Sequence, residues 1–337
     1  MKHDAFALVT GASRGLGMAF ARELAARHQN LILVARSLEP LNALASELRH
    51  SNSVSVVTLQ MDLASPGTGQ RLAQALSDCN LPINLLVNNA GFGLRGEFRT
   101  LELRRQLEML HLNNEAIVEL TYGLLPNMLK QRYRGIINVS SSAGFQPIPY
   151  ASLYAATKAF LTTFSLALEQ ELRTQKVTVV TICPGRLRAV NESSVPTRPS
   201  AGRLASVFQT YVETVQDALR TLEKGGGLTV PGALNKFTVF GQGFIPSCKS
   251  SQLRASMQVR SHSAAAGSQV VGIAGFKARP LGDGASVRPL WLPSSRVLGA
   301  KHRMPRLAEI EYVLQARETD TRPAVSALEN LIQEMVA

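Results

Sequence analysis

The stretch Thr10-Gly11-Ala12-Ser13-Arg14-Gly15-Leu16-Gly17 follows a short apolar run at 5–9 and precedes a helical pattern at 19–27. A glycine-rich turn between a strand and a helix lets the backbone approach a phosphate, and the helix N-terminus attracts negative charge. The spacing is G-x-x-x-G-x-G rather than G-x-G-x-x-G, so the motif alone is a weak signal. Its position between the first strand and the first helix predicts a phosphate-binding turn.

Beyond this turn, apolar runs alternate with helical patterns. The predicted strands cover 5–9, 31–35, 54–60, 83–87, 135–140 and 177–182, with a last short strand at 228–230. The predicted helices cover 19–27, 38–48, 69–76, 101–130, 154–173 and 205–223. This repetition predicts an α/β fold, with a doubly wound parallel sheet covered by helices on both faces.

The 337 residues divide into three predicted regions. Residues 1–258 are expected to form a single domain, with a loop or lid over the substrate at about 186–225. Residues 259–305 are rich in Gly, Ser, Pro and Arg, which predicts an irregular or flexible segment. Residues 306–337 have apolar spacing that predicts a helical segment, and its role cannot be inferred from the sequence.

The composition is that of a globular protein with a basic surface. The formal net charge is +12, but the basic residues are scattered and not interleaved with aromatic ones. This pattern favours attraction of anionic ligands over specific nucleic-acid binding. The three cysteines, Cys79, Cys183 and Cys248, and the six isolated histidines lack disulfide or metal-ligand spacing, so no metal site is expected. With no apparent signal peptide or transmembrane run, we expect a cytoplasmic protein.

A second motif lies downstream, where Tyr154 and Lys158 follow Ser141 by thirteen and seventeen residues. A tyrosine is a poor acid or base at neutral pH, because its phenol titrates at about pH 10. A lysine four residues later on a helix lies on the same face, so we expect its ammonium to lower the pKa of Tyr154. A serine at the end of the preceding strand could hydrogen-bond the same reacting oxygen. The trio predicts proton transfer at an alcohol or carbonyl oxygen.

The end of the second predicted strand holds Ala35 and then Arg36. A site for NAD usually has an acidic residue here, which binds the ribose 2′-hydroxyl. Arg14 projects from the glycine turn nearby. Two guanidinium groups suit a 2′-phosphate, because arginine forms bidentate, charge-assisted hydrogen bonds. The pair predicts NADP(H) as cofactor; the alternative is that both are ordinary surface arginines.

Together these motifs resemble those of the short-chain dehydrogenase/reductase family. They occur in the family's order: Thr10–Gly17, Asp62-Leu63, Asn88–Gly91 as N-N-A-G, Asn113, Asn138–Gly144 as N-V-S-S-x-A-G, Tyr154–Lys158 and Pro184-Gly185. The resemblance is close over about 1–185 and weaker to about 250, where Val230–Gly232 and Asn235-Lys236 are similar to a broad-specificity reductase-like subgroup. It implies a Rossmann-type sheet of about seven strands in the order 3-2-1-4-5-6-7 and a homo-dimer or homo-tetramer.

The resemblance also implies catalytic roles. Tyr154 would be the general acid/base, and Lys158 would lower its pKa and hold the nicotinamide ribose. Ser141 would position and polarise the substrate oxygen, and Asn113 would bend its helix and hold a water in the proton relay. The implied cofactor contacts are Gly11, Ser13, Arg14, Gly15, Leu16, Gly17, Arg36, Asp62, Leu63, Asn89, Ala90, Gly91, Tyr154, Lys158, Pro184 and Gly185.

The substrate region is less well defined. Its expected wall consists of apolar residues, which could equally be core residues: Phe92, Leu94, Phe145, Pro147, Ile148 and Tyr150. After Pro184-Gly185 the family often has a threonine that contacts the cofactor carboxamide, but here that place holds Ala189. The loop around it is basic, which fits either an anionic substrate or a solvated lid.

Three functional hypotheses follow from the sequence. The first is an NADP(H)-dependent oxidoreductase acting on a small-molecule carbonyl or secondary alcohol. The second is a non-catalytic dinucleotide-binding sensor or scaffold, against which the complete set of Ser141, Tyr154 and Lys158 argues. The third, a nucleic-acid binder, rests on net charge alone.

Overall fold

The computed structural model describes residues 5–185, 187, 209–232, 235–236 and 239. Within them, one parallel sheet has the strand order β3-β2-β1-β4-β5-β6-β7. The strands are β1 (Phe6–Thr10), β2 (Asn30–Ala35), β3 (Val56–Gln60), β4 (Ile83–Asn88), β5 (Gly135–Val139), β6 (Thr178–Ile182) and β7 (Gly227–Thr229). The predicted fold class and strand order are confirmed.

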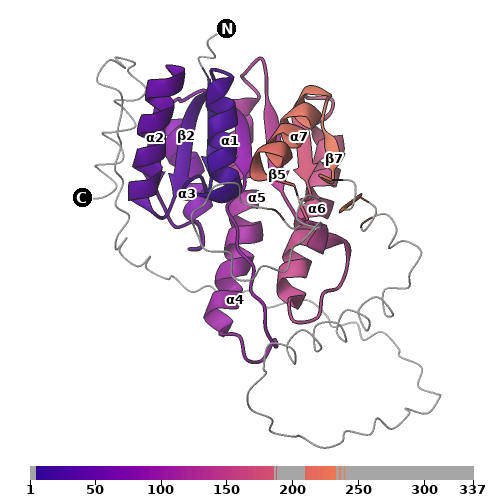
Figure 1. Ribbon diagram of the computed structural model, residues 1–337. Helices are drawn as coiled ribbons and strands as arrows, with labels where there is room; N and C mark the ends of the chain where they lie inside the picture. Colours follow the sequence, from indigo (N-terminus) through magenta and orange to yellow (C-terminus); the bar gives the residue numbers. More distant parts are fainter. Residues whose placement is uncertain (1–4, 186, 188–208, 233–234, 237–238, 240–337) are drawn as a thin grey trace, which may run out of the picture.

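Helices cover both faces of the sheet (Figure 1). They are α1 (Gly15–Ala26), α2 (Leu38–Asn52), α3 (Thr68–Asp78), α4 (Leu103–Leu110), α5 (Ala116–Met128), α6 (Ser152–Leu172) and α7 (Tyr211–Glu223). One core cluster joins the sheet to α1, α2 and α7, and the other joins it to α3, α5 and α6. Strand residues alternate between the clusters, because successive side chains of a strand point to opposite faces.

The predicted long helix at 101–130 is divided in the structure. A π-helical turn, η1 (His111–Glu115), separates α4 from α5. A π turn contains an extra residue, and such turns often occur at functional sites. The sequence pattern missed this interruption because both sides of it are regular helix. A 3₁₀ turn, η2 (Ser142–Phe145), was also not predicted.

Some predictions fall on residues that the structure does not describe. The lid region is described only at Leu187 and from 209 onward, where a capping box of Thr210 and Glu213 begins α7. The proposed segments 259–305 and 306–337 lie outside the described residues, as does Cys248. In the described part of the chain, no helix is both long and apolar enough to cross a membrane.

The fold places the glycine turn and the N-N-A-G motif at the carboxyl ends of neighbouring strands. Strand β1 pairs with β2 on one side and with β4 on the other, so the strand order reverses between β1 and β4. In open α/β sheets, ligands bind outside the carboxyl ends of the strands at such a reversal. The glycine turn follows β1 and the N-N-A-G motif begins at the end of β4, so both lie at this point.

Candidate active site

The glycine turn after β1 is shaped by positions that exclude a side chain. Gly11 and Gly15 have φ angles of 66° and 56°, in the left-handed region that favours glycine. A Cβ on Gly17 would lie 2.2 Å from the carbonyl oxygen of Gly11. Helix α1 begins at Gly15, and its N-cap, Arg14, makes no side-chain capping bond. The turn therefore presents backbone N–H groups at a helix N-terminus, where an anion binds favourably.

A threonine hydroxyl holds this turn against the end of β4. Thr10 Oγ1 donates to Val87 O at 3.2 Å and accepts from the amides of Asn89 and Ala90, each at 3.0 Å. The Asn89 side chain returns the contact, because its Nδ2 donates to Thr10 O at 2.8 Å. The two predicted cofactor motifs are thus joined by direct hydrogen bonds.

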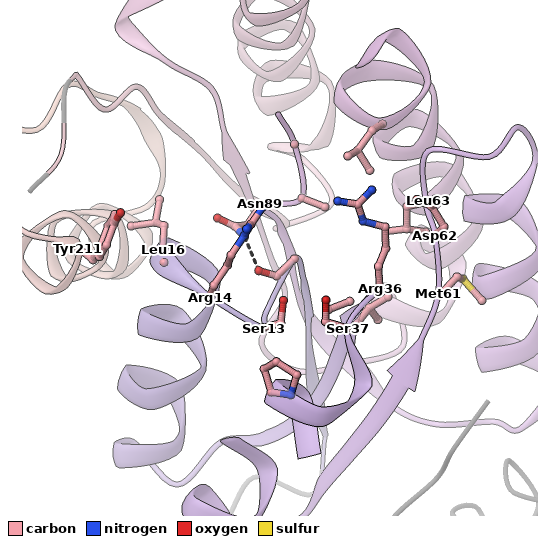
Figure 2. A pocket seen from close by; sticks show the side chains of 18 residues that line it. Ser13, Arg14, Leu16, Arg36, Ser37, Met61, Asp62, Leu63, Asn89 and Tyr211 are labelled. Atoms are coloured by element: carbon pink, nitrogen blue, oxygen red, sulfur yellow. Dashed lines mark hydrogen bonds between the residues drawn. The ribbon is translucent and has the colours of Figure 1, made fainter. Parts of the chain in front are cut away.

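Most of the predicted cofactor-binding residues line one cavity of about 540 Å³ (Figure 2). Those that line it are Gly11, Ser13, Arg14, Gly15, Leu16, Arg36, Asp62, Leu63, Asn89, Ala90 and Gly91. Gly17 lies beneath the turn, while Tyr154, Lys158, Pro184 and Gly185 are not among the residues that line the cavity. The structure therefore brings eleven of the predicted cofactor contacts to one cavity.

The two predicted phosphate-binding arginines border the cavity from different elements. Both are exposed, and among the described residues neither forms an ion pair. Ser37, which the sequence analysis did not name, also lines the cavity and is the N-cap of α2. Its hydroxyl makes no capping bond within the helix. A second helix N-terminus therefore lies beside Arg14 and Arg36, and its only sequence signal was a serine before the predicted helix.

Tyr211 is another lining residue that the sequence did not predict. It opens α7, and its ring carbon Cζ is 3.8 Å from the position that a Cβ on Gly15 would occupy. Figure 2 shows it beside Leu16 at one end of the cavity. Nothing in the local pattern could indicate this contact, because more than 190 residues separate the two positions.

Asp62 and the Pro184-Gly185 turn have structural contacts of their own. One carboxylate oxygen of Asp62 accepts from Ala64 N at 3.1 Å, which is a local turn bond, and the residue still lines the cavity. Pro184 O accepts from Ser142 N at 2.9 Å, next to Ser141. The Asn235 amide packs so closely on Gly185 that a Cβ there would lie 2.1 Å from its Oδ1.

Ser141 and Tyr154 come together at the end of β5. Burial raises the pKa of Tyr154 above its usual value, and a side-chain hydrogen bond with Ser141 opposes this rise. The Ser141 hydroxyl also accepts from Ala143 N at 3.1 Å and so caps η2. Its neighbour Ser140 instead donates to Lys158 O at 2.9 Å, a structural contact. Of the two neighbouring serines, Ser141 is the one that influences the pKa of Tyr154.

Lys158 is buried, and its position corrects one prediction. Burial lowers the pKa of Lys158 to about 8, and the nearby Cys183 thiol opposes this effect. Its Nζ donates to Val139 O at 2.9 Å and lies 3.6 Å from where a Cβ on Gly91 would be. We expected Lys158 to lower the pKa of Tyr154, but that pKa is raised, and burial is the main cause. The ammonium is directed toward the backbone and the cavity-lining Gly91.

Asn113 lies in the π turn and is fully buried. Its Oδ1 accepts from Phe92 N at 3.1 Å, while its Nδ2 donates to Phe92 O at 3.0 Å and to Thr157 Oγ1 at 3.1 Å. This π turn interrupts the helix at the position where a bend was predicted. The side chain joins the loop after Gly91 to α6, which carries Tyr154 and Lys158.

The expected substrate wall is divided by the structure. Leu94 and Tyr150 lie with Tyr154 around a small cavity. Phe145, Pro147 and Ile148 line a separate apolar groove along α6, together with Ala155, Ala156 and Ala159. At about 100° per residue, Ala156 lies on the side of α6 opposite Tyr154 and Lys158. Phe92 packs against the core, with the Arg105 guanidinium 4.9 Å from its ring centroid. Core or surface packing therefore accounts for part of the predicted wall.

Comparison with known proteins agrees with this arrangement. The family model described as short chain dehydrogenase matches residues 5–198. A relative named ketoacyl reductase HetN, from a Nostoc strain, is 33% identical over 200 residues, which are 59% of this chain and 69% of that protein. The human 17-beta-hydroxysteroid dehydrogenase type 3 is 33% identical over 182 residues, 53% of this chain and 58% of that protein. The chain thus spans under two thirds of the human relative's length.

Among solved structures, a short-chain dehydrogenase from Sphingobium yanoikuyae in complex with NADPH is similar to this chain. The sequence identity is 26% and the TM-score 0.58, over 81% of this chain and 100% of that one. The family match covers more than half of the chain and includes the glycine turn, the N-N-A-G motif and the Ser141, Tyr154 and Lys158 set. The chain belongs to the short-chain dehydrogenase family, whose members are oxidoreductases that act on carbonyl groups and alcohols.

Proposed function

We propose that the protein is an NADP(H)-dependent oxidoreductase that interconverts a carbonyl group and a secondary alcohol, with Tyr154 as general acid/base. The observation that carries this proposal is the placement of the Tyr154 phenol beside Ser141, with its ring packed against Gly93. One loop joins the Tyr154 ring to the large cavity, because Gly91 lines the cavity and Gly93 packs on the ring. A cofactor site and a proton donor therefore adjoin each other.

The cavity fits a phosphorylated dinucleotide. Its floor is a glycine turn without room for a Cβ at Gly17, and two helix N-termini border it. Arg14, Arg36 and Ser37 would bind a 2′-phosphate, since charged donors at a helix N-terminus favour that dianion. The free carboxylate oxygen of Asp62 would contact the adenine. When bound, the nicotinamide supplies the hydride chemistry, and the protein supplies position and electrostatics.

The proton step would use the phenol of Tyr154. Because burial raises its pKa, the phenol stays protonated at neutral pH and can donate to the substrate oxygen during carbonyl reduction. Ser141 would hold the same oxygen. Lys158, beside Gly91, would hold the nicotinamide ribose. Asn113 would fix the position of the loop after Gly91 relative to α6. These roles agree with the arrangement of the side chains.

The names of the relatives support a ketone or a secondary alcohol as the reacting group. Leu94 and Tyr150 beside Tyr154 would contact the part of the substrate next to that group. We also propose that residues 1–258 carry the activity and that the protein is cytoplasmic. A homo-oligomer is supported by apolar side chains exposed on α5 and α6, among them Tyr122 and Phe160, which are 83% and 47% exposed.

A substrate panel tests the proposal. Full-length protein and the Tyr154→Phe variant are incubated with NADPH and ketones, aldehydes, steroids and acyl thioesters, and absorbance follows NADPH consumption. We expect turnover with at least one carbonyl substrate and a loss of at least about 10²-fold in Tyr154→Phe, with NADPH affinity unchanged. NADPH binding without turnover across the panel would support the sensor hypothesis instead.

A further inference from the structure

We infer that Thr157, held by the consecutive amides Asn113 and Asn114, is a positioning residue that fixes the helical turn between Tyr154 and Lys158. The inference rests on the proposed function, because it assigns Thr157 a role in placing the proton donor. Thr157 is not one of the residues expected to touch substrate or cofactor. It lies inside the Y-x-x-x-K motif, at a position that the motif leaves open.

The hydroxyl and the backbone carbonyl of Thr157 both form hydrogen bonds with the side chains of Asn113 and Asn114. Its hydroxyl donates to Tyr154 O at 2.8 Å and accepts from Asn113 Nδ2 at 3.1 Å. Its carbonyl accepts from Asn114 Nδ2 at 3.0 Å. Thr157 is 1% exposed, so water cannot replace a partner that is lost. The turn that carries Tyr154 is therefore attached to the π turn at two points.

The π turn explains how two consecutive residues reach the same partner. In a regular α-helix, consecutive side chains point about 100° apart and would not both face one residue of a neighbouring helix. Asn113 and Asn114 lie within η1, and both contact Thr157. The extra residue of a π turn thus has a local use here, as such turns often do at functional sites.

The same contacts extend to the loop on the other side of the tyrosine ring. Asn113 is bonded to both backbone groups of Phe92. At the next residue, Gly93, a Cβ would lie 3.0 Å from the Tyr154 ring. The ring thus lies between a loop and a helix that Asn113 and Thr157 connect. Loss of the Thr157 hydroxyl would let the two surfaces shift, and a displacement of about 1 Å can cost about 10²-fold in rate.

Isosteric substitution separates positioning from packing. Thr157→Val keeps the shape and removes the hydroxyl, while Thr157→Ser keeps the hydroxyl. Thr121→Val is a matched control. Thr121 is also buried, and its hydroxyl accepts a hydrogen bond from the Asn88 side chain, but it lies in α5 and not in the turn that carries Tyr154. The full-length protein is used, with the best substrate of the panel, and kcat, KM, the pH dependence of kcat and the Kd for NADPH are measured.

We expect Thr157→Val to lower kcat by about tenfold or more and to move the pH profile, with the Kd for NADPH within about twofold of wild type. Thr157→Ser should keep most of the wild-type kcat, and Thr121→Val should resemble wild type. A wild-type kcat and pH profile in Thr157→Val would overturn the inference. Equal losses in Thr157→Val and Thr157→Ser would also overturn it, because they would indicate packing alone.

Two further variants keep the test decisive. If Thr157→Val does not fold, the half-buried Asn114→Ala removes one contact from the same turn, and unchanged kinetics there would contradict the inference. Tyr154→Phe separates this inference from the proposed function. Wild-type turnover in Tyr154→Phe contradicts both, whereas an inactive Tyr154→Phe with a wild-type-like Thr157→Val contradicts the positioning role alone.

Discussion

The two halves of the sheet hold the site in different ways. Around β1 and β2, the cavity is bordered by exposed side chains that carry charge or a hydroxyl, such as Arg14, Arg36 and Ser37. Around β4, β5 and α6, Asn113, Thr157 and Lys158 are buried and hydrogen-bonded to the backbone or to each other. The first half is suited to binding a negatively charged ligand, while the second holds the Tyr154 side chain in position.

This difference predicts how substitutions will act. In the open half, a change should affect which cofactor binds, because each side chain contributes a separable contact. In the buried half, a change should affect the rate, because the side chains act as one connected network. Each experiment below tests one side of this contrast.

The largest effect on cofactor binding is expected at Arg36 in the open half. Arg36→Asp replaces a cation near the ribose with an anion, which should weaken NADPH binding by about 10²-fold and leave NADH binding nearly unchanged. Fluorescence titration with both cofactors measures the two Kd values. Equal losses for NADPH and NADH would show that Arg36 does not contact a 2′-phosphate.

A smaller effect is expected from Gly93→Ala in the buried half. The new Cβ would lie 3.0–3.2 Å from three carbons of the Tyr154 ring, so the ring or the loop must move by a few tenths of an ångström. We expect kcat to fall by about tenfold with the Kd for NADPH unchanged. If cofactor affinity fell and kcat did not, the separation between the two halves would be wrong at this residue.

Lys158→Met tests what the buried network costs in stability. Because burial lowers the pKa of Lys158 to about 8, its charged form is disfavoured in the folded protein. That cost is fully present below pH 8 and disappears as the pH rises from 8 toward the unfolded value of 10.5. Lys158→Met should thus be inactive and raise Tm by a few degrees at pH 7.

The measurement is thermal unfolding of both proteins between pH 7 and 10. The advantage of Lys158→Met over wild type should shrink across this range, because wild type loses its buried charge. A constant difference in Tm would show that the charge of Lys158 has no such cost.

The smallest effect is expected from removing residues 259–337. If residues 1–258 form the catalytic domain, the shortened chain should bind NADPH within about twofold of the full chain. Fluorescence titration checks the affinity, and circular dichroism checks the fold. Unfolding of the shortened chain would show that the domain extends beyond 258.

The sequence predicted the open half better than the buried half. Strands, helices and the lining of the cavity follow from local patterns, because glycine turns and strand ends carry their signal in a few adjacent residues. Arg14 and Arg36 were found because each follows a strand that the pattern locates. Tyr211 was missed because its contact with Gly15 depends on the packing of α7 against α1.

The buried half depends on contacts that no local pattern contains. Tyr154, Lys158 and Ser141 were identified by spacing, but the direction of the Tyr154 pKa was wrong. Spacing places Lys158 on the same helical face, yet its Nζ is bonded to Val139 O, and burial dominates the titration of the phenol. The π turn and the bonds from Asn114 were likewise not visible, because they depend on the packing of η1 against α6.

The π turn between α4 and α5 makes the site sensitive to chain length as well as to residue type. Removing one residue from 111–115 could restore an uninterrupted α-helix with good local geometry. Both neighbouring helices would survive with their side chains facing nearly the same way, because a π turn accommodates its extra residue within that one turn. Asn113 and Asn114 would then no longer both face Thr157. A deletion that leaves the secondary structure intact would thus separate folding from activity.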